Sequence, residues 1–172
     1  MSTSSGSFRI GHGYDLHRLE PIAPDGPGRP LVIGGVGLDH PLGPVGHSDG
    51  DVLLHALTDA LLGAVAAPDI GQLFPDTDPA FDGADSAVFV ARALSELSRQ
   101  GFGVVNIDAT VVLERPKLAP IKDTIRSRLA EMLGIGLEAV NVKGKTHERV
   151  DAVGQGRAVE AHAVVLVERV HG

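Results

Sequence analysis

An extended segment near the start of the chain carries two side chains that can bind a metal ion: Phe8-Arg9-Ile10-Gly11-His12-Gly13-Tyr14-Asp15-Leu16-His17. Residues two apart in an extended chain point to the same side, so Asp15 and His17 present a carboxylate and an imidazole together. A helix predicted over about residues 49–66 can bring His55 to them. Two nitrogens and one oxygen suit Zn²⁺ and leave a fourth position for water or substrate, as in catalytic zinc sites. The alternative interpretation is that these are ordinary packed histidines.

The segment around His55 has the features of an amphipathic helix. Ser48 precedes Asp49 and Asp51, which is a helix-start signature. The apolar residues that follow have helical spacing: Leu53, Leu54, Leu57, Ala60, Leu61, Ala64 and Val65. His55 would lie about two turns into the helix. Asp51 and Asp59 would then lie one turn away on either side, where either carboxylate can orient the second ring nitrogen of His55.

The remaining segments predict an α+β fold in one domain, residues 8–172, after a disordered leader at residues 1–7. We expect a mixed sheet of about four main strands with helices packed on one face. A long Pro-rich segment, residues 67–85, is predicted to be irregular but ordered by Phe74 and Phe81. The other expected elements are a hairpin of residues 31–33 and 36–38 about Gly34-Gly35, a helix capped by Asp85 or Ser86 that runs to about Arg99, a strand at 104–113, a helix from Pro120 ended by Gly134, and strands at 140–145 and 158–170.

Composition limits the possible functions. The 172 residues include no cysteine, so any zinc site must use His, Asp or Glu. A net charge of −7 argues against a nucleic-acid-binding surface. No apolar run approaches the roughly 20 residues that span a bilayer, and no secretory signal is visible, so we expect no membrane association and a cytoplasmic location.

Five segments, in this order, resemble the 2-C-methyl-D-erythritol 2,4-cyclodiphosphate synthase family of the non-mevalonate isoprenoid pathway. They are residues 9–17, the helix segment from His47 to Ala64, Asp69-Ile70-Gly71 with Phe74-Pro75-Asp76-Thr77-Asp78, Leu113-Glu114-Arg115-Pro116-Lys117-Leu118-Ala119, and the closing motif around Thr146 and Glu148. The resemblance covers nearly the whole chain. It implies a phosphorus-oxygen lyase that uses no protein nucleophile.

The implied reaction starts from 4-diphosphocytidyl-2-C-methyl-D-erythritol 2-phosphate. Its 2-phosphate attacks the β-phosphorus of the diphosphate, which closes a ring and releases CMP. The resemblance assigns Asp15, His17 and His55 to Zn²⁺ or another divalent metal. It assigns Glu148 to a second divalent ion, Mg²⁺ or Mn²⁺. Two cations would explain how an acidic protein binds so anionic a small-molecule substrate.

The resemblance also implies roles for residues that hold the substrate. His47 and Thr146 would stabilise the transition state, and Ser48 would contact phosphate. The segments Asp69 to Gly71 and Phe74 to Asp78 would bind the methylerythritol part, with Asp76 as a hydroxyl acceptor. The residues from Leu113 to Ala119 would bind cytidine, with Lys117 near its phosphate. The substrate-binding set is Ser48, Asp69, Ile70, Gly71, Phe74, Pro75, Asp76, Thr77, Asp78, Leu113, Glu114, Arg115, Pro116, Lys117, Leu118, Ala119, Lys145 and His147.

The family is a homotrimer with its sheets toward the three-fold axis and its active sites between subunits. Some members bind an isoprenoid diphosphate on that axis, but Ala152, Gln155 and His162 replace the residues linked to it, and Arg157 would be a different cation. Lys145 stands where the familiar motif has threonine. Its side chain would either contact a phosphate or face solvent, and the sequence favours neither alternative. A bacterial cytoplasm is favoured, with a processed plastid protein as the alternative.

Two other functions fit the same metal ligands. A zinc hydrolase of a phosphorylated metabolite would use metal-bound hydroxide. A protein whose zinc only stabilises the fold, or a metal or metabolite carrier, would have no catalysis. Oxygen from solvent in the product would favour the hydrolase. Unfolding of His55→Ala without a specific catalytic loss would favour the structural role.

Overall fold

The computed structural model describes residues 7–75 and 77–170, which fold around one mixed five-stranded sheet. The strand order is β4-β1-β7-β5-β6, with β5 and β6 parallel and the other neighbours antiparallel. The strands of this sheet are β1 (Phe8–Pro21), β4 (Leu42–Pro44), β5 (Phe102–Val112), β6 (Val140–Lys145) and β7 (Ala158–Arg169). A separate antiparallel hairpin consists of β2 (Val32–Ile33) and β3 (Val36–Gly37).

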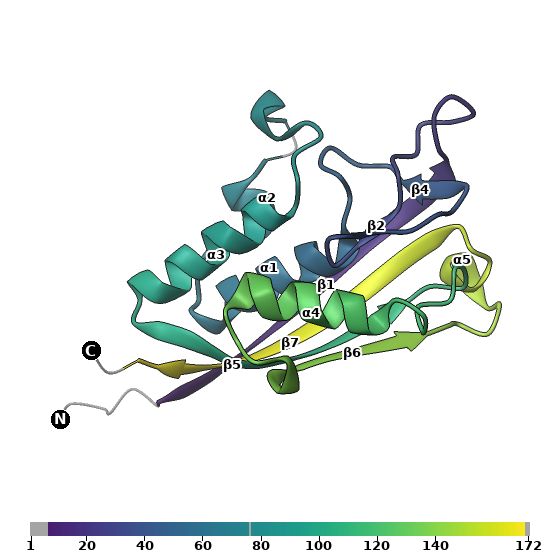
Figure 1. Cartoon of the computed structure of the whole chain (residues 1–172). Helices are drawn as coiled ribbons and strands as arrows, with labels where there is room; N and C mark the ends of the chain where they lie inside the picture. The colour runs from purple at the N-terminus through teal and green to yellow at the C-terminus, as the bar shows by residue number, and fades with distance from the viewer. Residues whose placement is uncertain (1–6, 76, 171–172) are drawn as a thin grey trace.

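The three long helices lie on one face of the sheet (Figure 1). They are α1 (Val52–Ala64), α3 (Ala87–Arg99) and α4 (Lys122–Leu133). Shorter helical turns are α2 (Ile70–Leu73), η1 (Pro79–Phe81), η2 (Leu137–Ala139) and α5 (Asp151–Gly154). Between the helices and the sheet lies a single large aliphatic core that includes the fully buried Leu53, Leu57, Leu61, Ile107 and Val165. This arrangement confirms the predicted α+β class.

Two glycines on β1 let α1 lie directly against the strand. A Cβ atom added to Gly13 would lie 1.8 Å from the carbonyl oxygen of Ala56, and one added to Gly11 would lie 1.8 Å from that of Ala60. Any larger residue would therefore push the helix away. Because His55 is next to Ala56 in α1, this close approach also sets its distance from the side chains of β1.

Within the described residues, no helix covers the opposite face of β1. Ile10, Tyr14 and Leu16 alternate with the buried residues and are 69%, 47% and 45% exposed. On β7, Val164 continues the same face and is 41% exposed. The chain thus leaves a partly apolar sheet surface open while its other face is covered.

The start of α1 differs from the prediction. Asp51, not Ser48, is the N-cap, and its carboxylate accepts hydrogen bonds from the backbone N–H groups of Leu53 and Leu54. The same carboxylate accepts from Gly34 at 2.9 Å and Gly35 at 2.7 Å, the turn of the β2–β3 hairpin. This hairpin was predicted correctly. Both glycines have positive φ. Asp51 is completely buried, and the N–H groups of the two glycines supply hydrogen bonds that its carboxylate could not obtain from water.

Other elements agree with the sequence except at their limits. The four main strands are β1, β5, β6 and β7, and the short β4 is a fifth strand that was not expected. β1 runs to Pro21, beyond the expected end of the extended segment. Residues 67–85 were expected to lack regular structure, yet they contain α2 and η1. Phe74 and Phe81 pack edge to face at 5.3 Å between ring centroids. Residues 1–6 of the expected leader lie outside the described residues.

No helix in the described part of the chain is both long and apolar enough to cross a membrane.

Candidate functional site

The structure brings the three predicted metal ligands together at the junction of β1 and α1. Asp15 Oδ2 lies 3.0 Å from His55 Nδ1 and 3.4 Å from His17 Nδ1. One ligand atom from each residue can be chosen so that all lie within 4.8 Å of one another. The side chains are only 27%, 15% and 14% exposed for Asp15, His17 and His55. Alternation on β1 places Asp15 and His17 on the face that α1 covers, as predicted.

The hydrogen bonding around these ligands fits a bound cation. His17 Nδ1 is buried and has no hydrogen-bond partner among the described residues. A buried polar atom of this kind is costly unless something else satisfies it. Burial lowers the pKa of the His17 imidazole, although Asp15 opposes the shift. Burial would raise the pKa of Asp15, but its hydrogen bond with His55 and its proximity to His17 lower that pKa overall. Both shifts favour the deprotonated forms that bind metals.

The second ring nitrogen of His55 has partners that the sequence did not indicate. His55 Nε2 lies 2.9 Å from Ser86 Oγ and 3.1 Å from Ser48 Oγ. The expectation that Asp51 or Asp59 orients this ring was wrong. Asp51 caps the helix, and the Asp59 carboxylate accepts from the Ile70 backbone N–H at 2.8 Å.

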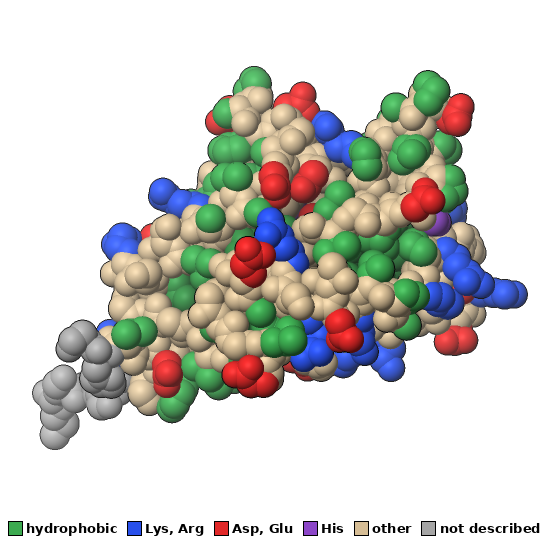
Figure 2. All heavy atoms as spheres, viewed as in Figure 1, with side chains coloured by type: hydrophobic (Ala, Val, Ile, Leu, Met, Phe, Trp, Pro, Cys, Tyr) green, Lys and Arg blue, Asp and Glu red, His purple; other side chains and the backbone are tan. Residues whose placement is uncertain are grey.

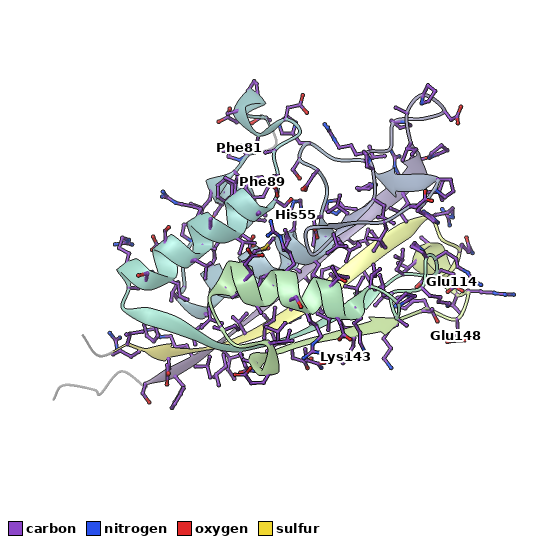
Figure 3. The ribbon with its side chains drawn as sticks, viewed as in Figure 1. His55, Phe81, Phe89, Glu114, Lys143 and Glu148 are labelled. Carbon is purple, nitrogen blue, oxygen red and sulfur yellow. The ribbon has the colours of Figure 1, made fainter. Side chains whose placement is uncertain are left out.

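A cavity of about 300 Å³ opens beside the metal ligands. Figure 3 shows His55 below Phe81 and Phe89, at the end of α1 near the 67–85 loop. His47 Nε2 lies 2.9 Å from the backbone oxygen of Asp78, which ties this loop to the segment before α1. The lining residues are His17, Val45, Gly46, His47, Ser48, His55, Ile70, Gly71, Phe74, Phe81 and Phe89. Phe89 was not predicted; it lies 4.6 Å from Phe74 and 5.8 Å from His55 between ring centroids.

The aspartates of the 67–85 loop have local structural partners. Asp69 caps α2 by accepting from the Gln72 backbone N–H at 2.9 Å, and Asp78 accepts from Ala80 in the same way at 2.9 Å. Pro75 and Thr77 are exposed. Asp76, the expected hydroxyl acceptor, lies outside the described residues. Without the resemblance, turn and cap roles are what the sequence favours for these aspartates.

A second cavity, of about 350 Å³, lies where the loop after β5 meets the end of β6. It contains most of the residues expected to bind a nucleotide and a second cation. The lining residues are Leu113, Lys117, Leu118, Ala119, Lys122, Gly144, Lys145, Thr146 and Glu148. The sequence analysis did not identify Lys122, because a lysine at the start of a helix is an ordinary polar residue there. With Lys117 and Lys145 it gives this cavity three ammonium groups.

The loop after β6 holds Glu148 in an unusual backbone conformation. Glu148 has a φ of 52°, in the left-handed region that non-glycine residues seldom adopt. Its carboxylate accepts a hydrogen bond from the Thr146 hydroxyl at 2.9 Å. His147 lies 2.8 Å from Asp151 and 3.2 Å from Glu160. An outlier of this kind costs free energy and is typical of functional loops.

The two predicted halves of the site are separate within one chain. No residue lines both of these cavities. In Figure 3, Glu148 lies at the right-hand end of the molecule, whereas His55 lies near the middle, below Phe89. Glu114 and Arg115 line a third hollow with Arg149 and Gln155. Figure 2 shows Lys and Arg side chains gathered at the end that carries α5, whereas acidic and basic side chains both border the hollow near the 67–85 loop.

Comparisons with known proteins agree with this geometry. The model of the YgbB family matches residues 8–168. The chain is 52% identical over 162 residues to a chloroplastic 2-C-methyl-D-erythritol 2,4-cyclodiphosphate synthase of Oryza sativa subsp. japonica, covering 94% of this chain and 70% of the rice protein. It is 52% identical over 164 residues to the synthase of Dechloromonas aromatica (strain RCB), covering 95% and 99%. A CDP complex of IspF from Plasmodium falciparum superposes with a TM-score of 0.83 at 32% identity, covering 98% and 100%. The chain therefore belongs to the YgbB family.

Proposed function

We propose that this protein converts 4-diphosphocytidyl-2-C-methyl-D-erythritol 2-phosphate to 2-C-methyl-D-erythritol 2,4-cyclodiphosphate and CMP. The observation that carries the proposal is the Asp15, His17 and His55 cluster, in which His17 Nδ1 is buried without a hydrogen bond. In the reaction, an oxygen of the 2-phosphate forms a bond to the β-phosphorus. The bond from that phosphorus to the oxygen shared with the α-phosphate breaks, and CMP leaves with the electron pair.

The first cavity would hold the reacting phosphates. Asp15, His17 and His55 would bind Zn²⁺, which as a Lewis acid would stabilise charge on a phosphate oxygen. His47 and Ser48 line the same cavity, in the segment just before α1. We assign His47, together with Thr146, to stabilisation of the transition state. The methylerythritol part would lie against the loop that runs from Asp69 to Asp78.

The second cavity would hold the nucleotide. Its lysines offer the positive charge that an acidic chain otherwise lacks. Lys117 would lie near the cytidine phosphate, and the backbone from Leu113 to Ala119 would contact the base. Glu148 would bind Mg²⁺ or Mn²⁺, since a carboxylate oxygen is the donor that these ions prefer. Thr146, through its hydrogen bond, would hold the Glu148 carboxylate in place.

The separation of the two cavities supports a homotrimer. A substrate that reaches both a metal site and a nucleotide site must find the two within its own length, whereas one chain presents them in separate cavities with no shared lining residue. Pairing the first cavity of one subunit with the second cavity of its neighbour would complete the site. The uncovered sheet face, with Ile10, Tyr14, Leu16 and Val164, supports packing of the sheets toward a three-fold axis. Residues 8–172 would form the repeating domain, and a bacterial cytoplasm is the proposed location.

Phosphorus NMR of the purified protein with the candidate substrate tests the function. The expected products are CMP and a cyclic diphosphate, and a chelator should stop their formation until a divalent metal is restored. Repeating the reaction in water enriched in oxygen-18 separates cyclisation from hydrolysis. Cyclisation places no solvent oxygen in the product, so incorporation of the label would refute the proposal. The relatives described above are named as synthases, and nothing in them favours a hydrolase.

A further inference from the structure

We propose that Ser86, held by Asp49, is a positioning residue that sets which ring nitrogen of His55 faces the metal site. Ser86 comes directly before α3 and is completely buried. Its hydroxyl lies between the carboxylate of Asp49 and the imidazole of His55. The inference deepens the proposed function, because it concerns the ligand set assigned there to zinc.

The direction of the hydrogen bonds determines the tautomer. The Ser86 hydroxyl donates its only hydrogen to Asp49 Oδ1 in a very short contact. Toward His55 Nε2, at 2.9 Å, Ser86 Oγ can therefore only accept, so the ring hydrogen must be on Nε2. Nδ1 is then the nitrogen that faces Asp15 Oδ2 at 3.0 Å. A second ring hydrogen on Nδ1 donates to that carboxylate in the metal-free site, and a bound cation would take the place of this hydrogen.

Ser86 forgoes the usual function of a serine at this place. It is the N-cap residue of α3, where serine normally accepts a hydrogen bond from the helix backbone. Its side chain makes no such bond. A hydroxyl that is directed to His55 and Asp49 instead of its own helix departs from the local rule, and such departures are expected at functional sites.

The backbone holds the dyad of Asp49 and Ser86 in place. Asp49 Oδ2 accepts from the Ser86 backbone N–H at 3.1 Å, and the Asp49 N–H donates to the carbonyl of Ala84 at 3.0 Å. One step away, the Gly83 N–H donates to the His47 carbonyl at 2.7 Å. The segments before α1 and α3 are thus tied together by three hydrogen bonds. Partners of this kind, which orient a metal-binding histidine through its other nitrogen, typically contribute 10–100-fold in metal affinity.

Ser48 is the competing partner of His55 Nε2, at 3.1 Å. Its hydroxyl oxygen already accepts from the Gly50 backbone N–H at 3.1 Å, and Ser48 also lines the first cavity. The Ser48 hydroxyl makes no hydrogen bond to Asp49, so the direction of the Ser48 O–H group is not determined as it is for Ser86. Ser86 is therefore the partner that determines the tautomer, and Ser48 shares the Nε2 hydrogen.

The test compares Ser86→Ala with Ser95→Ala in the full-length protein. Ser95 is a matched control on the same helix, with its hydroxyl bonded to the Ala91 carbonyl at 3.0 Å. Zinc affinity is measured by competition with a chromophoric chelator. We expect about 10–100-fold weaker binding for Ser86→Ala and no more than about a twofold change for Ser95→Ala. Ser86→Ala removes a buried hydroxyl with two partners, so its thermal unfolding midpoint should be lower than that of Ser95→Ala, and zinc affinity is compared at a temperature where both metal-free variants are folded. Unchanged zinc affinity in folded Ser86→Ala would overturn the proposal.

A second measurement does not depend on activity or on bound metal. Nitrogen-15 NMR of the histidines in the metal-free protein should show a hydrogen on His55 Nε2, whether or not Nδ1 also carries one toward Asp15, and Ser86→Ala should lose this preference for Nε2. Ser86→Thr, which keeps a hydroxyl, should restore both the tautomer and most of the zinc affinity. Should the wild-type protein show no cyclisation while Ser86→Ala still alters the tautomer and zinc binding, only the proposed reaction fails. Full cyclisation activity with an unaltered tautomer in Ser86→Ala would leave the reaction standing and reject the positioning role.

Discussion

The two cavities of this chain are built in opposite ways. The first cavity lies over a packed junction of β1 and α1, and the three candidate metal ligands beside it are mostly buried. The second cavity, proposed to hold the nucleotide, lies between a loop and the end of a strand, and the side chains of Lys145 and Glu148 are exposed. The first is organised by core packing and the second by backbone conformation, including the left-handed Glu148.

This difference indicates how each half would respond to mutation. A buried site shares its supports with the core, so changes near it should alter stability and metal binding together. An exposed site contributes little to the core, so changes there should alter ligand binding while the fold remains intact. The predictions below test that contrast, beginning with the largest expected effect.

Gly13→Val should break the metal half most completely. The new side chain would meet the Ala56 carbonyl oxygen and force α1 away from β1. We expect a loss of more than about 3 kcal/mol in the free energy of unfolding, together with loss of bound zinc. Urea denaturation and metal analysis measure the two effects. Gly37→Val is the matched control, since no heavy atom lies within 4 Å of a Cβ at Gly37, and it should cost less than about 0.5 kcal/mol.

His17→Ala should abolish turnover without unfolding the protein. Loss of a metal ligand removes a Lewis acid that lowers the activation barrier by several kcal/mol, so kcat/KM should fall by about 1,000-fold. His12→Ala is the control on the same strand, because His12 lies on the opposite face next to His162. Its zinc affinity should stay within about twofold of wild type. Equal zinc loss in both variants would show that the faces of β1 are not functionally distinct.

Glu148→Gln should affect the nucleotide half alone. A neutral amide is a poorer ligand for Mg²⁺, so we expect the Mg²⁺ concentration for half-maximal activity to rise about 10-fold while zinc content is unchanged. Glu131→Gln serves as the control, since Glu131 only pairs with Arg128 on the exposed side of α4. A metal titration curve identical to wild type would contradict the assignment of Glu148.

Lys122→Ala should have the smallest effect. A single partly exposed ammonium near a phosphate contributes about 1 kcal/mol or less, so KM should rise by no more than about fivefold, and less at high salt. Lys143→Ala is the matched control, because Lys143 pairs with Asp108 at 2.7 Å outside the lined cavity. A KM that changes equally in both variants would remove Lys122 from the site.

Local pattern explains most of what could be predicted. The aliphatic spacing of α1 and α4, the Gly34-Gly35 turn and the alternation of β5 are properties of neighbouring residues, and each appears in the structure. The cap of α1 was misplaced because Ser48, Asp49 and Asp51 all suit a helix start, and the choice of Asp51 depends on the hairpin that packs against it. β4 was missed because three residues carry no periodicity.

For the candidate site, the ligand types were predictable but their surroundings were not. Asp15 and His17 follow from strand alternation, whereas Ser86 is 31 residues from His55 and was noted only as a helix cap. Phe89 and Lys122 show no pattern that separates them from ordinary helix residues. The separation of the two cavities also depends on where the loop after β5 lies relative to α1. The spacing of residues along the sequence does not indicate that position.

By itself, the sequence determined the chemistry of this protein: candidate metal ligands without sulfur, an aliphatic core, and the order of helices and strands. These depend on residue identity and on contacts between near neighbours. Only the tertiary structure decided how closely α1 approaches β1, which hydroxyl faces His55, and that one chain holds its two cavities apart. Such features depend on contacts between residues distant in the chain, whose geometry is set by the packing of the whole core.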